Sequence, residues 1–150
     1  MVTGSVGCVF AARAYFRDTR NRVLEQQLRF RMDLKRTEFK CGQLQAAMTH
    51  GRQSRMAVLA ATGHGQSGYT VQFKQWVDSD LKSTVELTQQ LTAIAANPDP
   101  DDIGALVART AEVHGVEVEV QSLADKYKKF LEEDDADRKR IADRHEPPRR

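Results

Sequence analysis

The chain has 150 residues, of which 40% are hydrophobic, 29% charged and 7% aromatic. This length suffices for one domain, and the sparse, clustered Gly and Pro residues argue against an all-β fold, which needs frequent turns. A net charge of +2 excludes no class of partner by itself, but residues 1–60 hold 11 Lys and Arg against 4 Asp and Glu, and residues 61–150 hold 12 against 17. The basic half could therefore attract nucleic acid or anionic lipid; the alternative is that the two halves attract each other, within one chain or between copies.

The two cysteines, Cys8 and Cys41, are too few for a disulfide framework in a chain of this length. No stretch approaches the roughly 18 apolar residues that span a bilayer, and residues 1–16 lack the leading positive charge of a secretory signal. An intracellular location is therefore expected, with an organelle transit peptide as the alternative because arginines recur after residue 12.

The first predicted helix covers about residues 15–48. One stripe at helical spacing, interrupted only by Thr37, consists of Phe30, Leu34, Cys41, Leu44 and Met48. A second stripe beside it consists of Leu24, Leu28, Met32 and Phe39, and together the two stripes predict one broad apolar face. Gly42 is a weak point that costs about 1 kcal/mol relative to Ala.

The segment from Thr49 to Tyr69 breaks this pattern. It contains a short apolar run over residues 56–61, and then Gly63-His64-Gly65-Gln66-Ser67-Gly68, which matches G-x-G-x-x-G. A dinucleotide site would also need a second parallel strand after the following helix, whereas another helix is predicted there. The segment is therefore expected to form a short helix and a flexible hinge, and no cofactor is predicted.

The second predicted helix begins at Ser67 or Thr70, either of which can cap it, and runs to about residue 96. Its apolar residues cover a broad face, typical of a bundle more than of a narrow coiled-coil seam: Phe73, Trp76, Val77, Leu81, Val85, Leu87, Leu91 and Ile94. The helix ends at a turn over residues 97–100, Asn-Pro-Asp-Pro. Asp99 is expected to cap the next helix and Pro100 to occupy its first position.

The third predicted helix shows the clearest period. Two heptad positions are filled by Leu106, Val113, Val120 and Tyr127, and by Arg109, Val116, Leu123 and Phe130. The alternative is a strand over residues 116–120, where apolar and acidic residues alternate. Residues 132–140 are expected to form a solvated helix end with Asp134–Arg138 and Asp135–Lys139 pairs.

The hairpin around the Asn-Pro-Asp-Pro turn, residues 91–115, resembles that of type III secretion needle and inner-rod subunits. The resemblance implies a helical subunit of a secretion apparatus. Those subunits end in an apolar helix, whereas this chain ends in Arg-His-Glu-Pro-Pro-Arg-Arg.

No catalytic, metal-binding or cofactor-binding residue is predicted. The four histidines lack metal-ligand spacing, and no pair of carboxylates has an evident cleft to shift its pKa values. The basic residues of the first helix do not share one face and accompany no nucleic-acid-binding signature, so nucleic acid remains the alternative partner.

The sequence therefore predicts an all-α protein whose long amphipathic helices form a helical hairpin or bundle, or a coiled-coil assembly. Its expected regions are a basic helical region (1–62), a glycine-rich hinge (63–69), a helical hairpin (70–145) and a disordered tail (146–150). The expected function is that of a non-enzymatic structural or adaptor subunit that packs against helices of its own kind or of another protein. The residues predicted to bind the partner are Phe30, Leu34, Leu44, Met48, Leu81, Leu91, Leu106, Val113, Val120 and Tyr127.

Overall fold

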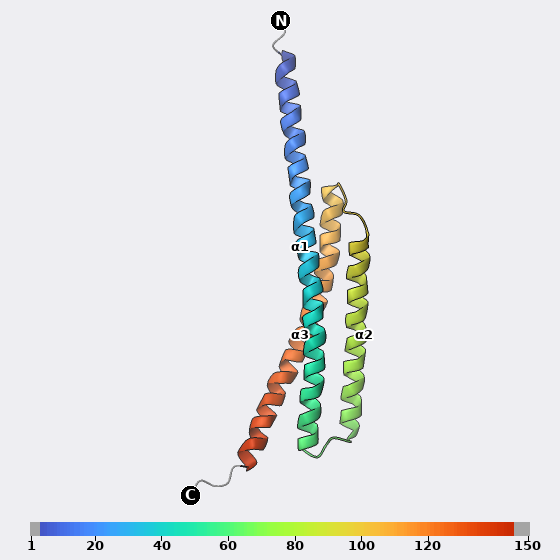
Figure 1. Cartoon of the computed structure of the whole chain (residues 1–150), viewed down its shortest axis with the longest axis vertical. Coiled ribbons are helices and arrows are strands. Elements are labelled where there is room, and N and C mark those ends of the chain that lie inside the picture. The colour runs from blue at the N-terminus through green and yellow to red at the C-terminus, as the bar shows by residue number, and fades with distance from the viewer. Residues whose placement is uncertain (1–3, 146–150) are drawn as a thin grey trace.

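The computed structural model describes the backbone of residues 4–145 and the side chains of residues 17–144. Three helices and no strand occur in this range: α1 (Gly4–Ala61), α2 (Gly68–Ala96) and α3 (Ile103–His145). The helices pack side by side as a bundle, in which α1 and α3 run in one direction and α2 runs back (Figure 1). The predicted all-α fold is confirmed, and the strand alternative for residues 116–120 is wrong. The predicted disordered tail lies outside the described residues.

A single core lies between the three helices, and its positions recur at alternating steps of three and four residues in each of them. The α1 side of the core runs from Phe30 to Val58, and the α3 side runs from Leu106 to Asp134. This spacing keeps one stripe of a helix facing its neighbours over many turns. The predicted heptad of the third helix is therefore confirmed as a set of core positions, with Arg109, Leu123 and Phe130 only partly buried.

The first helix continues without a break through residues 49–51, so the separate short helix predicted after residue 48 is wrong. The Thr49 hydroxyl donates a hydrogen bond to the Gln45 carbonyl, which keeps this polar side chain inside the helical pattern. Gly51 is buried because the ring of Tyr127 lies over it, and a Cβ at this position would be 3.1 Å from the ring. A glycine that looks like a helix breaker is thus a point of close helix packing.

Ser67 caps α2, as predicted, by accepting a hydrogen bond from the Thr70 amide. The broad apolar face predicted for this helix is wrong, because Val85 is 47% exposed and Trp76 is 44% exposed. The core stripe instead passes through the fully buried Thr84, whose hydroxyl bonds to the Asp80 carbonyl of the preceding turn. The spacing of apolar residues did not reveal this narrow stripe, because polar residues occupy some of its positions.

The turn between α2 and α3 falls where the Asn-Pro-Asp-Pro sequence predicts it, but α3 begins three residues later than expected. Asp102, and not Asp99, caps α3 by accepting a hydrogen bond from the Ala105 amide. Asp99 instead forms an ion pair with Arg31 of α1, at 2.6 Å. Arg109 donates hydrogen bonds to the carbonyls of Ile94 and Pro98, which explains a cation at a core position.

The molecule is elongated because α1 extends well beyond the α2–α3 turn at one end, while the last turns of α3 diverge from α2 at the other (Figure 1). The opposite charges of the two halves of the chain meet within the bundle. Lys40 of α1 pairs with Glu117 of α3 at 2.7 Å, and Arg52 pairs with Asp78 of α2 at 3.0 Å. Attraction between the halves thus operates within one chain.

Candidate partner-binding surface

The residues that the sequence predicts to bind a partner lie in the interior of this chain. All of them are buried between α1, α2 and α3 except Leu81, which is half-buried: Phe30, Leu34, Leu44, Met48, Leu81, Leu91, Leu106, Val113, Val120 and Tyr127. The structure therefore brings these residues together as a folding core. A surface that could receive a partner has to be sought among the exposed apolar side chains.

Large apolar side chains are exposed along one side of α1, which we call the outer face. Leu24 is 49% exposed, Leu28 63%, Met32 68% and Phe39 67%. From Leu28 onward the steps of four and three residues continue through Lys35 and Gly42 to Ala46, all of them exposed. At about 100° per residue this face points away from the core stripe of the same helix. The prediction that the two stripes of this helix form one broad apolar face is wrong, because the structure places them on opposite sides of α1.

The outer face has the pattern of a second helix-packing surface. Alternating steps of three and four residues let a long helix contact a neighbouring helix over several turns. Gly42, inside this stripe, has no heavy atom of another part of the chain within 4 Å of a Cβ built on it. The backbone of α1 is therefore open to close approach from outside, and the surface can accommodate another helix.

Basic side chains border the outer face, and several of them are already paired. Arg29 forms an ion pair with Glu25, Lys35 with Glu38, and Arg31 with Asp99. Arg20 and Arg36 are exposed and have no ion pair within the described part of the chain. The surroundings of the outer face are consequently basic, with free positive charge at Arg20 and Arg36.

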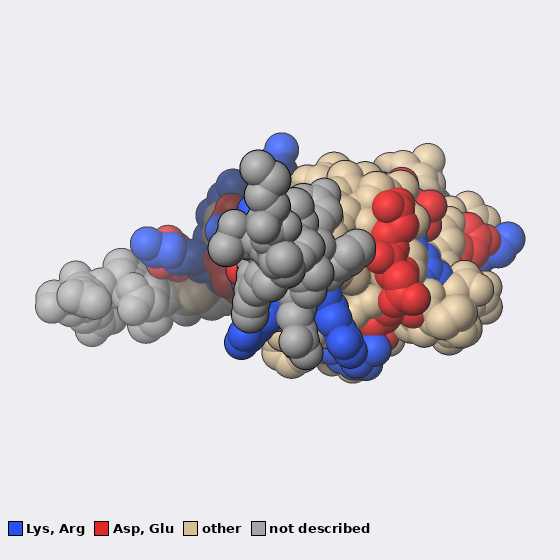
Figure 2. All heavy atoms as spheres, turned by 90° about the horizontal axis from the view of Figure 1, so that it is seen from above, with Lys and Arg blue, Asp and Glu red and all other residues tan. Residues whose placement is uncertain are grey.

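A groove of about 450 Å³ lies between α2 and α3. Its lining combines small and apolar residues with acidic or amide side chains, namely Gln90, Ala93, Ile94, Glu112, Gly115, Val116 and Glu119. Glu112 and Glu119 are exposed and form no ion pair or hydrogen bond with the side chains described. We call this depression the α2–α3 groove; it is apolar at its floor and acidic at its rim. Seen from above, acidic side chains form a band on the bundle to one side of the residues drawn in grey, with Lys and Arg side chains next to it (Figure 2).

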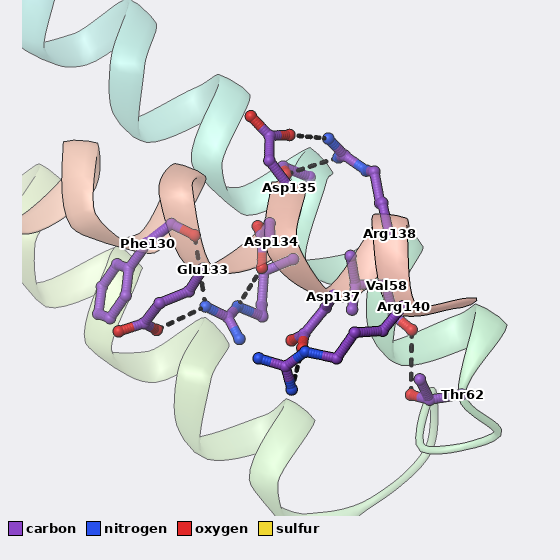
Figure 3. Close-up of polar contacts among 11 residues, drawn as sticks. Val58, Thr62, Phe130, Glu133, Asp134, Asp135, Asp137, Arg138 and Arg140 are labelled. Carbon is purple, nitrogen blue, oxygen red and sulfur yellow. Dashed lines mark hydrogen bonds and ion pairs between the residues drawn. The ribbon is translucent and has the colours of Figure 1, made fainter. Parts of the chain in front are cut away.

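A buried ion pair joins α1 to α3 at the other end of the bundle. Arg55 Nε lies 2.7 Å from Oδ1 of Asp134, whose side chain is fully buried. Arg55 also reaches Glu133 at 3.1 Å and donates a hydrogen bond to the Phe130 carbonyl, whereas neither carboxylate oxygen of Asp134 accepts a hydrogen bond in the described structure (Figure 3). The predicted Asp134–Arg138 pair is wrong, and so is the predicted Asp135–Lys139 pair, since Asp135 binds Arg138 at 2.8 Å. The signal was in the sequence: residue 134 continues the heptad of Val113, Val120 and Tyr127.

A second polar contact lies deep in the bundle, where the Tyr127 hydroxyl donates a hydrogen bond to Asp80 at 2.9 Å. Burial and the neighbouring Asp80 carboxylate raise the pKa of Tyr127 above its ordinary value. Burial also raises the pKa of the Cys41 thiol, which forms no disulfide. The hydrogen bond from Lys40 lowers the pKa of Glu117. These pKa shifts follow from the packing of the helices and do not indicate an active-site cleft.

The glycine-rich loop after α1 is joined to helices at both ends and lacks the strand of a dinucleotide fold. Gly63 has a positive φ of 78°, which permits the chain to leave α1, and Thr70 of α2 donates a hydrogen bond to the His64 carbonyl. No cluster of three or more His, Cys, Asp or Glu residues suited to a metal ion occurs in the described structure. Among the described residues, no helix has the length and apolar character needed to span a membrane.

The class defined by this geometry is a long three-helix bundle with an apolar stripe left exposed on its first helix. Comparison of the chain with known protein families, with curated proteins and with solved structures gives no match. The exposed stripe of α1 is therefore the feature from which a function can be inferred.

Proposed function

We propose that this protein is a non-enzymatic structural or adaptor subunit whose α1 helix binds a helix of a partner through the outer face, in the manner of a coiled coil. The observation that carries the proposal is the exposure of Leu28, Met32 and Phe39 at 63%, 68% and 67% on one side of a helix. Contiguous apolar patches of this kind commonly mark sites of protein interaction. Their spacing by three and four residues favours a helical partner over an irregular one.

The outer face of α1 differs from the buried core stripe of the same helix, and this difference supports a role of the outer face in assembly more than in folding. The core stripe of this helix, from Phe30 to Val58, already packs against α2 and α3. Burying the outer face would add nothing to the internal core, yet leaving it in water forgoes the gain of about 25 cal/mol for each Å² of apolar surface. A partner helix would recover that free energy.

Nucleic acid is the weaker candidate for a partner. Much of the basic charge of α1 is engaged in ion pairs, including Arg31 with Asp99 and Lys40 with Glu117. Side chains held in this way are less available to phosphates, which dominate the affinity of nucleic-acid-binding proteins.

Site-specific photo-crosslinking in cells tests the proposal. A photoreactive phenylalanine analogue at Met32 should give a discrete adduct with a helical protein, because this position would face the partner. The same analogue at Val85, which is exposed at 47% on α2, is the matched control and should give little adduct. Equal, diffuse labelling from both positions would contradict a specific interface on α1.

A further inference from the structure

We propose that the outer face of α1 binds the α2–α3 groove of a second copy of this chain. The inference rests on the proposed function and identifies the partner as the protein itself. The outer face presents Leu28, Met32 and Phe39, and the α2–α3 groove presents a floor of Ala93, Ile94, Gly115 and Val116.

The shapes of the two surfaces are complementary. The outer face projects large side chains, whereas the floor of the groove includes two small residues, Ala93 and Gly115. A Cβ built on Gly115 has no neighbour within 4 Å, so nothing in this chain requires a glycine in the middle of α3. Glycine in a helix interior is unfavourable, and a helix of another molecule that approaches this backbone supplies a reason for it.

The charges of the two surfaces also match. Arg36, which borders the outer face beside Met32 and Phe39, has no ion pair in the described structure, and neither have Glu112 and Glu119 on the rim of the groove. Contact between the two surfaces would bring opposite charges together at the edge of an apolar centre, an arrangement found in protein interfaces. If two outer faces met each other, their basic borders would repel. The outer face is therefore better matched by the α2–α3 groove than by a second outer face.

The two surfaces lie on opposite sides of the bundle. No α1 residue lines the groove, and the outer face points away from the core that α1 shares with α2 and α3. One molecule therefore cannot exchange both surfaces with the same neighbour. Such contacts are heterologous, and they add molecules front to back until a ring closes or a filament grows.

Light scattering and sedimentation of the purified full-length chain test this contact. The wild-type protein should associate as its concentration rises through the micromolar range, and added salt should weaken that association because charges face each other. Met32→Glu places a carboxylate on the outer face opposite the acidic rim of the groove, and Gly115→Lys fills the space that the glycine leaves in the groove. Each should lower the association constant by roughly tenfold or more. Both positions are exposed, so circular dichroism should show an unchanged helical fold.

The matched controls change charge on exposed positions outside both surfaces. Val85→Glu on α2 and Val118→Lys on α3 lie at residues that are 47% and 55% exposed and do not line the groove. Both controls should associate like the wild-type protein.

The decisive measurement mixes the two interface variants. Met32→Glu retains an intact groove and Gly115→Lys retains an intact outer face, so an equimolar mixture should form a 1:1 complex that cannot grow further. If Gly115→Lys still associates alone while Met32→Glu does not, the outer face pairs with itself and the inference is wrong. If the purified wild-type chain stays monomeric while Met32 cross-links to another protein in cells, the inference fails and the proposed function stands.

Discussion

Two charged residues at core positions, Arg55 and Asp134, form a buried ion pair between α1 and α3. Arg55 and Asp134 occupy positions that apolar residues fill elsewhere in α1 and α3, and they meet at 2.7 Å with the carboxylate fully buried. Removing two charges from water costs several kcal/mol for each ion, so such a pair contributes little net stability. We infer that it specifies register, because a shift of α3 along α1 would leave both charges buried and unpaired.

The two members of this pair should respond unequally to substitution. Arg55→Met leaves the Asp134 carboxylate buried without a partner and should lower the free energy of unfolding by about 3–5 kcal/mol. Asp134→Leu should cost less, because Arg55 keeps Glu133 at 3.1 Å and the Phe130 carbonyl. The double variant should recover much of the loss, as an apolar contact replaces the pair.

Urea unfolding followed by circular dichroism measures these differences. Asp135→Asn, at a side chain that is 74% exposed in its pair with Arg138, is the control and should change stability little. Equal losses in Arg55→Met and Asp134→Leu would show that the other contacts of Arg55 contribute nothing.

At the scale of an element, α1 is a helix with two apolar faces that have different roles. The face from Phe30 to Val58 folds the chain, and the face from Leu24 to Ala46 is exposed. Gly42 and Gly51 of α1 lie on these two different faces. Gly42 lies on the outer face in open space, whereas Gly51 lies against Tyr127 in the core.

Alanine at these two positions should therefore have different effects. Gly42→Ala should raise the free energy of unfolding by about 0.5–1 kcal/mol, since it restores helix propensity without a clash. Gly51→Ala should lose that gain or become destabilising, because its Cβ would be 3.1 Å from a Tyr127 ring that is fully buried and bonded to Asp80. Thermal unfolding under dilute, monomeric conditions tests the pair, and a similar gain in both variants would mean that the ring moves freely.

At the scale of the whole molecule, one continuous core joins three helices whose individual lengths far exceed their width. Val120 is 1% exposed within that core, and Val118, two residues away on α3, is 55% exposed. Because the helices share the core, a defect in one of them should weaken all three.

Substitution by Asp at these two positions tests this cooperation. Val120→Asp buries an unpaired charge and should cost several kcal/mol, a large part of the stability of a typical domain. Val118→Asp should change stability by less than about 0.5 kcal/mol, as is usual on a surface. The urea midpoint of far-ultraviolet circular dichroism should fall only in Val120→Asp, and a comparable fall in both variants would contradict the packing of α3.

The sequence by itself determined the features that depend on local chemistry. The helical class, the Ser67 cap, the turn at residues 97–100 and the heptad of the third helix follow from spacing, capping side chains and proline, which act over a few residues. The exposed stripe of α1 was also visible as a pattern. Its separation from the core stripe was not, because periodicity shows that a face is apolar and not what covers it.

Tertiary structure alone decided what depends on contacts between distant residues. Only packing shows that Gly51 receives the ring of Tyr127, that Asp99 pairs with Arg31 and leaves the cap of α3 to Asp102, and that Asp134 is buried beside Arg55. In each case a residue type with a strong local preference is used by a partner 68 or more positions away in the chain. The physical reason is that contacts between helices exist only once the helices have met, and the buried ones, at Gly51 and Asp134, can outweigh a local preference worth about 1 kcal/mol.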